Sequence, residues 1–273
     1  MPVLNLTTSP GLHYFRERPA DERPTTLKIK IGKDNKLLKS SRSNIKNEAR
    51  RAGIDPNPTT PIDPRLAVRQ AAQHLFSDAR GSHDWEHTLR VHRLCLHIGP
   101  KEGADMEVLE CAAYLHDIGR ATQDAANGGV CHAIKGAEMA RDILAPLTIT
   151  EAGKANIVHC VRAHRFRSDY PPESIEARVL FDADKLDAIG AVGVARAYLF
   201  AGELGACLHN PDVPPEMTRP YSRDDTGYRE FVVKLCKIKD RFLTAEGRRL
   251  AEERHAFMAL FFRRFLEEYE GIR

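Results

Sequence analysis

Apolar residues recur at helical spacing along almost the whole chain from residue 64 onward. Glycine and proline interrupt these stretches at short intervals, for example at Gly99-Pro100 and Pro171-Pro172. Strands and helices do not alternate, so the pattern predicts an all-α domain. The predicted helices span residues 65–79, 84–98, 105–118, 132–144, 150–165, 174–189, 192–204, 226–242 and 245–270.

Residues 1–62 differ in composition from the rest of the chain, with many Pro, Ser, Thr, Asn, Lys and Arg residues and few large apolar ones. Leu27, Ile29 and Ile31 alternate with lysines before a turn, which predicts a short β-hairpin. We therefore divide the chain into an N-terminal extension (1–62) and a helical domain (63–273). The extension is expected to be a partly disordered appendage; the alternative is a small element that docks an acidic protein partner.

Charge and cysteine usage narrow the class of protein. The 41 basic and 38 acidic side chains give a net charge of +3, which gives no strong reason to expect nucleic acid or a membrane as partner. No apolar run could span a bilayer and the N-terminus lacks a signal-peptide pattern, so we expect a cytoplasmic protein. The six scattered cysteines are expected to be reduced thiols, while twelve histidines are many for this length and suggest metal binding.

Three of the predicted helices carry an ionisable residue on an apolar face. His116 ends one apolar stripe, His87 opens another, and Asp184 lies inside a third; Asp117 directly follows His116. Burying such groups costs several kcal/mol, roughly, unless each finds a partner. The stripes are Leu109, Ala112 and Ala113 before His116, then Val91, Leu94, Cys95 and Ile98 after His87, and Ala177, Leu180, Phe181 and Ala188 around Asp184.

One divalent cation would compensate for the burial of all these groups. Two imidazoles and two carboxylates suit a transition metal such as Mn²⁺, Fe²⁺, Co²⁺, Ni²⁺ or Zn²⁺, with Mg²⁺ as a further option. Spacing alone does not establish that the three helices converge. The alternative is a purely structural role for the buried set.

Three motifs follow one another along the chain: "HDWEHTLRV", "LHDIGR" and "DADKLDAIG". They resemble the HD-domain phosphohydrolase superfamily, whose pattern is H…HD…D on an all-α helical bundle. The resemblance implies His87 as the first metal ligand, His116 and Asp117 as the paired ligands, and Asp184 as the last. Residues 244–269 resemble the C-terminal helix of the small bacterial nucleotide (pyro)phosphohydrolases of this superfamily. The resemblance covers about three quarters of the chain and leaves the N-terminal extension without a counterpart.

Positive side chains close to these ligands are candidates for binding phosphate. Arg90 lies three residues after His87, on the edge of the same helix face, and is our preferred phosphate contact. Lys185 follows Asp184, and Arg120 follows the HD pair. For each of these basic residues taken alone, a solvated surface charge is the common alternative.

Two further histidines, His132 and His164, also lie on apolar stripes. We expect them to contact the substrate, together with the nearby Lys135 and Arg165. In some HD relatives, histidines at similar places bind a second metal. The acidic residue that bridges two metals is not evident beside the HD pair, so we expect one metal ion.

Catalytic roles are expected for Asp117, Asp187 and His83. His83 lies one helical turn before the first ligand, where it would support that ligand, act as an acid or base, or serve only the fold. Asp187 lies three residues after Asp184, where it would orient Lys185 or a metal-bound water, or act as a general base.

These observations predict a metal-dependent phosphohydrolase whose substrate is a small phosphate ester, namely a nucleotide. Resemblance to the small bacterial subgroup implies conversion of a nucleoside triphosphate to a monophosphate and pyrophosphate. A phosphodiesterase or nucleotidase is the alternative within the enzyme class. Outside it, the alternative is a nucleotide-binding sensor without catalysis, with the extension as its output. A homodimer is also considered.

Overall fold

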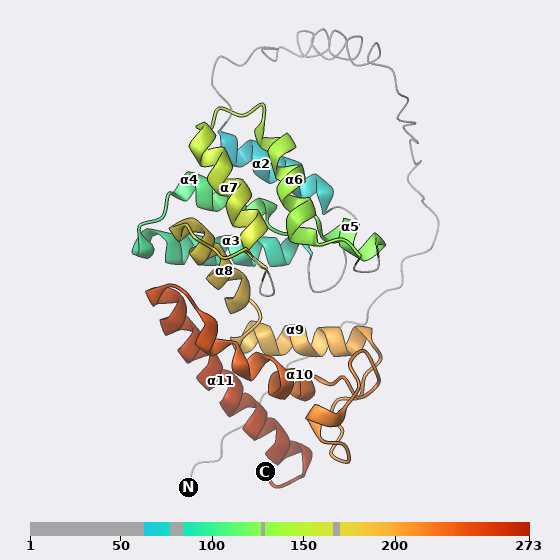
Figure 1. Cartoon of the computed structure of the whole chain (residues 1–273). Coiled ribbons are helices and arrows are strands. Elements are labelled where there is room, and N and C mark those ends of the chain that lie inside the picture. Colours follow the sequence, from blue (N-terminus) through green and yellow to red (C-terminus); the bar gives the residue numbers. More distant parts are fainter. Residues whose placement is uncertain (1–62, 77–83, 127–128, 166–169) are drawn as a thin grey trace, which may run out of the picture. The chain divides into compact units, whose positions relative to one another are not determined.

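The computed structural model describes residues 63–76, 84–126, 129–165 and 170–273 (Figure 1). Helices make up the secondary structure of these residues, and none of them lies in a strand, which confirms the all-α prediction. The expected β-hairpin and extension lie outside the described residues, and the boundary at residue 62 stays a prediction. The helices are α2 (Pro64–Leu75), α3 (Trp85–Glu102), α4 (Met106–Leu115), α5 (Arg120–Ala125), α6 (His132–Leu144), α7 (Glu151–Ala163), α8 (Ile175–Leu186), α9 (Gly190–Glu203), α10 (Gly227–Val233) and α11 (Ala245–Tyr269).

Helix α4 lies at the centre of the bundle. Every residue from Val108 to Leu115 is buried except Glu110, which is half-buried. The helix packs against α2, α3, α7 and α8, because a helix that is apolar nearly all round needs neighbours on every side. Since α4 ends at Leu115, the HD pair begins the turn that follows and lies directly against this core.

Side-chain caps fix the starts of the two helices that carry site residues near their ends. Asp84 accepts a hydrogen bond from the main-chain N–H of His87 at 2.9 Å, so α3 begins there and His87 lies in its first turn. Ser174 accepts one from the N–H of Ala177 at 3.1 Å and starts α8 in the same way.

The end of α3 differs from the predicted one. The helix continues through Pro100 to Glu102 and stops at Gly103, whose φ of 73° lies in the left-handed region that favours glycine. Gly99 serves a different purpose, because a Cβ there would lie 2.6 Å from Cδ2 of Leu109. It permits the close approach of α3 and α4 and does not end the helix.

The long helix predicted over 226–242 is wrong. The chain forms the short α10 and then two 3₁₀ turns, Leu235–Lys237 and Lys239–Arg241. Leu235, Ile238 and Phe242 are buried along this stretch and belong to the hydrophobic core.

The C-terminal helices form a group beyond the end of α8. Helix α9 packs against α10 and α11, and α11 also contacts α3 and α8 (Figure 1). The buried carboxylate of Asp182 in α8 accepts hydrogen bonds from the main-chain N–H groups of Leu243 at 2.9 Å and Thr244 at 2.7 Å. These bonds attach the start of α11 to α8.

All six cysteines are free thiols, and Cys95, Cys111 and Cys160 are buried as expected. Burial raises the pKa of both Cys111 and Cys160 to about 12, so both stay protonated. Among the described helices, none combines the length and the apolar composition needed to cross a membrane.

Candidate metal centre

Six side chains from different parts of the bundle converge and form two groups of candidate metal ligands. They come from α3, the turn after α4, α6, the end of α7, and α8. Within each group the atoms that could bind a metal lie within 4.8 Å of one another. The first group is His87, His116 and Asp184, and the second is Asp117, His132 and His164.

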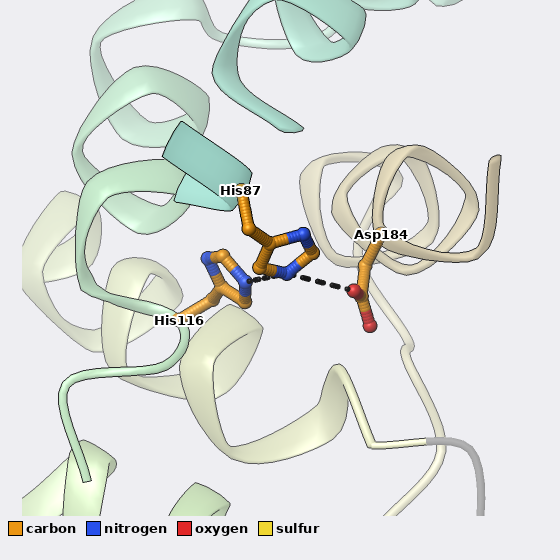
Figure 2. A group of neighbouring side chains, drawn as sticks. All are labelled: His87, His116 and Asp184. Atoms are coloured by element: carbon orange, nitrogen blue, oxygen red, sulfur yellow. Dashed lines mark hydrogen bonds and ion pairs between the residues drawn. The ribbon is translucent and has the colours of Figure 1, made fainter. Parts of the chain in front are cut away.

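The first group surrounds a point between α3, α8 and the turn after α4 (Figure 2). Nε2 of His87 lies 3.3 Å from Nε2 of His116 and 3.4 Å from Oδ1 of Asp184. Two nitrogens that bind one ion at about 2.0–2.1 Å with tetrahedral angles lie about 3.3 Å apart. The spacing of these atoms therefore fits shared coordination of one cation.

The second group has the same spacing. Nε2 of His132 lies 3.3 Å from Nε2 of His164. Oδ1 of Asp117 lies 3.5 Å from the first of these nitrogens and 3.4 Å from the second. The two histidines were expected to contact substrate, but they face the Asp117 carboxylate in a ligand-like arrangement.

Asp117 lies between the two groups. While Oδ1 faces His132 and His164, Oδ2 lies 3.9 Å from Nε2 of His87 and 3.9 Å from Nε2 of His116. The carboxylate is buried, with an exposed fraction of 2%. One oxygen of Asp117 is thus turned toward each group, which the sequence pattern did not reveal.

Each of the four histidines has a hydrogen-bond partner on the ring nitrogen that faces away from the centre. A carbonyl or carboxylate acceptor fixes the proton on Nδ1 and leaves the Nε2 lone pair directed inward. Metal-binding histidines usually have such an outer partner. The pairs are His116 with the carbonyl of Ala113 at 2.8 Å, His164 with that of Val161 at 2.7 Å, His132 with Oε1 of Gln123 at 2.8 Å, and His87 with Oδ2 of Asp187 at 2.7 Å.

Burial holds two of the imidazoles in the neutral form. It lowers the pKa of His116 to about 4 and that of His132 to about 3, against an ordinary value near 6.5. A metal binds the neutral imidazole, so these two side chains are ready as ligands at neutral pH.

His87 and Asp184 behave differently because each faces opposite charge. Burial lowers the pKa of His87, but hydrogen bonds with Asp184 and Asp187 outweigh burial and raise it. For Asp184, burial raises the pKa, but the Lys185 ammonium and the hydrogen bond with His87 lower it well below its ordinary value. Asp184 is therefore ionised, and His87 is the candidate ligand at which protons would compete with a metal.

Two of the expected phosphate-binding residues lie beside the carboxylates of the candidate ligands. Nη2 of Arg120 lies 3.1 Å and 3.2 Å from the two oxygens of Asp117. Lys185 donates to Asp184 and, at 3.0 Å, to the main-chain carbonyl of His164. Both cations border the centre, where they offset the negative charge of the carboxylates.

Lys135 and Arg165 lie farther out. Nη1 of Arg165 donates to Sγ of Cys131 at 3.2 Å, and Nζ of Lys135 pairs with Glu138 at 3.0 Å. Each follows a histidine of the second group by one helical turn or less. Neither has an interaction with a ligand carboxylate among the described contacts, so their substrate roles stay predictions.

Arg90 and Asp187 pair with each other. Nε of Arg90 lies 2.8 Å from Oδ1 of Asp187, and its Nη2 lies 3.1 Å from Oδ2. Burial raises the pKa of Asp187, but hydrogen bonds from His87 and Arg90 outweigh it and the pKa falls to about 2. The carboxylate of Asp187 is thus ionised and hydrogen-bonded to neighbouring side chains, and its expected catalytic role stays a prediction. His83 lies outside the described residues.

Two residues at the site were not anticipated from the sequence. Gln123 of α5 is the outer partner of His132, and Arg196 of α9 donates to Asp187 at 2.8 Å. Arg196 is the only charged residue between Gly190 and Phe200 in an otherwise apolar helix, and this isolation is the one signal that could have drawn attention to it.

Comparison with known proteins identifies the family. A family model for the HD domain matches residues 84–189, a range that includes all six ligand candidates. The uncharacterized protein YpgQ of Bacillus subtilis is 35% identical over 213 residues, which cover 75% of this chain and 93% of YpgQ.

Solved structures agree with this result. The crystal structure of Bacillus subtilis YpgQ in complex with ADP has a TM-score of 0.59 at 32% identity and covers 77% of this chain and 100% of that one. An HD-superfamily hydrolase from Bacillus thuringiensis has a TM-score of 0.61 at 28% identity, covering 77% and 99%. The chain belongs to the HD-domain family and is a metal-dependent phosphohydrolase. The resemblance seen in the three motifs is confirmed.

Proposed function

We propose that this phosphohydrolase acts on a nucleotide. The observation that carries the proposal is the pair of ligand groups that share Asp117, since a phosphate group is the natural partner of adjacent divalent cations. Support for the nucleotide comes from YpgQ, whose structure was solved in complex with ADP.

Within the site, we assign His87, His116, Asp117 and Asp184 to the binding of a divalent transition metal. Mn²⁺, Co²⁺, Ni²⁺, Fe²⁺ and Zn²⁺ all suit imidazole and carboxylate ligands. Although one ion was expected from the sequence, the spacing around Asp117 supports a second ion.

We propose that this second ion is held by Asp117, His132 and His164. A ligand role for the two histidines then replaces the substrate contacts that we assigned to them from the sequence. Their Nε2 atoms are directed at Oδ1 of Asp117, and their Nδ1 atoms are held by outer partners, as in the first group.

A bound divalent ion lowers the pKa of water, so that hydroxide forms near neutral pH. Side chains of the site are expected to hold the substrate in position and to offset its negative charge. Arg120 and Lys185 border the centre and supply positive charge for phosphate oxygens. We retain Arg165 and Lys135 as outer contacts to the substrate. Arg90 is the weakest candidate, since its guanidinium is paired with Asp187.

The bond cut is expected to lie between the α and β phosphates of a nucleoside triphosphate. This step rests on the resemblance of residues 244–269, which contain α11, to the C-terminal helix of the small bacterial pyrophosphohydrolases. A homodimer, a protein partner for the extension and a cytoplasmic location stay predictions.

The test is a substrate screen of the full chain with Mn²⁺, Co²⁺, Ni²⁺ and Mg²⁺ that measures phosphate and pyrophosphate separately. The proposal expects a monophosphate and pyrophosphate in equal amounts from a triphosphate. Release of phosphate alone would indicate a nucleotidase. Hydrolysis of bis(p-nitrophenyl) phosphate with no turnover of nucleotides would indicate a phosphodiesterase, and nucleotide binding without any turnover would indicate a sensor.

A further inference from the structure

Asp187 is the meeting point of three helices. It follows α8 directly, is 1% exposed, and accepts hydrogen bonds from side chains of α3 and α9. Its Oδ2 lies 2.7 Å from Nδ1 of His87 and 2.8 Å from Nη1 of Arg196, while its Oδ1 lies 2.8 Å from Nε of Arg90. Each oxygen is therefore held by a cationic side chain, and one of them also holds an imidazole.

The partner of His87 differs in kind from the outer partners of the other three histidines. His116 and His164 donate to main-chain carbonyls, and His132 donates to a side-chain amide. Of the four, His87 alone has a carboxylate as the outer partner of its Nδ1. A carboxylate makes the imidazole a stronger donor of electrons to a metal than a neutral acceptor does.

The carboxylate is in turn prevented from rotating. Arg90 binds it with Nε to Oδ1 and with Nη2 to Oδ2 at 3.1 Å, a two-point contact that fixes the carboxylate plane. Nη1 of Arg196 bonds both Oδ2 and, at 3.1 Å, the main-chain carbonyl of Asp187 itself. The second bond ties the end of α8 to α9, so the position of Asp187 depends on both helices.

We propose that Asp187 is a positioning residue that holds His87 in the Nδ1–H tautomer with Nε2 directed at the metal, and that Arg90 and Arg196 hold Asp187 in place. The proposal rests on the metal site assigned under the proposed function, but not on the identity of the substrate. It gives Arg90 and Asp187 roles other than phosphate contact and general base.

The tautomer is tested in the metal-free protein. Nitrogen-15 labelling of the histidine rings shows which nitrogen of His87 carries the proton at alkaline pH, where imidazoles are neutral. His87→Gln identifies the signal. We expect Nδ1–H in the wild type and a shift of population to Nε2–H in Asp187→Asn, whose amide can donate to Nδ1. An amide oxygen can still accept from Nδ1–H, so Asp187→Leu, which removes the acceptor, is measured as well. An unchanged tautomer of His87 in both variants would overturn the proposal.

Metal affinity provides the second readout. Competition with a chelator for Mn²⁺ or Co²⁺ should show affinity about 10- to 100-fold weaker in Asp187→Asn. Arg196→Met should also weaken binding, and Arg196→Lys should recover part of the loss because it restores a positive charge. Arg93→Met is the matched control, since Arg93 is exposed on α3, and it should bind metal as the wild type does.

The outcomes separate the two proposals. If Asp187→Asn does not fold, the comparison of Arg196→Met with Arg196→Lys decides the question by both readouts. Wild-type affinity and an unchanged His87 spectrum in Arg196→Met would then overturn the proposal. If the wild type binds no metal, the metal site is wrong, and the tautomer of the metal-free protein still decides the role of Asp187. Failure to hydrolyse nucleotides leaves both readouts intact.

Discussion

The main chain of Gly119 lies against the main chain of His132. A Cβ on Gly119 would lie 2.2 Å from the carbonyl oxygen of His132 and 2.6 Å from the amide nitrogen of Gly136. The φ of Gly119 is −81°, so the residue is glycine for reasons of space and not of backbone conformation. The contact brings the turn that carries His116 and Asp117 against the start of α6.

Gly119→Ala is expected to lower both stability and activity. The added methyl group meets main-chain atoms that cannot rotate away, so the turn or α6 must shift, at a cost of roughly 1–3 kcal/mol. The shift would also move His132 relative to Asp117. Thermal unfolding and turnover, measured on the same sample, check both effects. Gly202→Ala is the control, because a Cβ there meets nothing within 4 Å, and its stability should equal or exceed that of the wild type. Equal behaviour of the two variants would refute the packing role of Gly119.

Asp117→Asn is expected to abolish turnover and to reduce metal binding at both ligand groups. Its carboxylate has one oxygen turned toward each group, and an amide provides neither the charge nor the second equivalent oxygen. Metal content by elemental analysis and turnover measure the effect, while circular dichroism should stay close to the wild type. The control is Asp142→Asn, the same change at an exposed position of α6, which should leave metal content and turnover unaltered. Retained activity in Asp117→Asn would show that Asp117 is not part of the active site.

His132→Gln is expected to reduce the metal content by one equivalent. The side chain contributes only to the second group, so His87, His116 and Asp184 should still hold one ion. Titration with Co²⁺, followed by its visible absorption, gives the stoichiometry. An unaltered stoichiometry would contradict a ligand role for His132 and would favour the substrate contact expected from the sequence.

The sequence revealed the first ligand group because each of its members lies on an apolar helix face. His87 and His116 are buried and Asp184 is half-buried, so they stand out there as polar side chains that need a partner. The second group carried a weaker signal, since its carboxylate, Asp117, had already been assigned to the first. Asp117 lies between the two groups because the start of α6 and the C-terminal end of α7 pack against the turn after α4.

The outer partners of the histidines could not be predicted. Gln123 and Arg196 come from α5 and α9, and no spacing rule links them to the motifs. Their contacts arise from the packing of helices that are distant in sequence. The predicted end of α3 at Gly99 was wrong for a related reason. The glycine there is explained by the close approach of α3 and α4, which the sequence does not show.

Glu176 provides a test of the fold that is independent of catalysis. Its buried carboxylate accepts hydrogen bonds from the main-chain N–H of Asp105 and from Nδ2 of Asn156, both at 2.8 Å, and joins α4, α7 and α8. Burial raises the pKa of Glu176, but these bonds outweigh it and lower the pKa below the ordinary value. Glu176→Gln should therefore lower the free energy of unfolding at neutral pH by roughly 1–3 kcal/mol.

The pH dependence of this difference follows from the sign of the shift. A carboxyl group whose pKa is lowered in the folded state stabilises the fold above its unfolded pKa, and this stabilisation is lost as the pH falls through the folded value. The difference in urea unfolding between the wild type and Glu176→Gln should thus begin to shrink as the pH falls below the unfolded glutamate pKa of about 4.3, and continue to shrink toward the lowered folded pKa. Glu173→Gln, at an exposed position, should follow the wild type throughout. A difference that stays constant down to acid pH would contradict the assigned charge of Glu176.

Locating the bound metal tests most directly whether the two ligand groups hold metal ions. Anomalous scattering from crystals grown with Mn²⁺ identifies the ion without reference to activity. We expect one peak within bonding distance of Nε2 of His87, Nε2 of His116 and the Asp184 carboxylate, and a second peak beside Asp117, His132 and His164. A manganese ion bound elsewhere, with neither group occupied, would contradict this expectation.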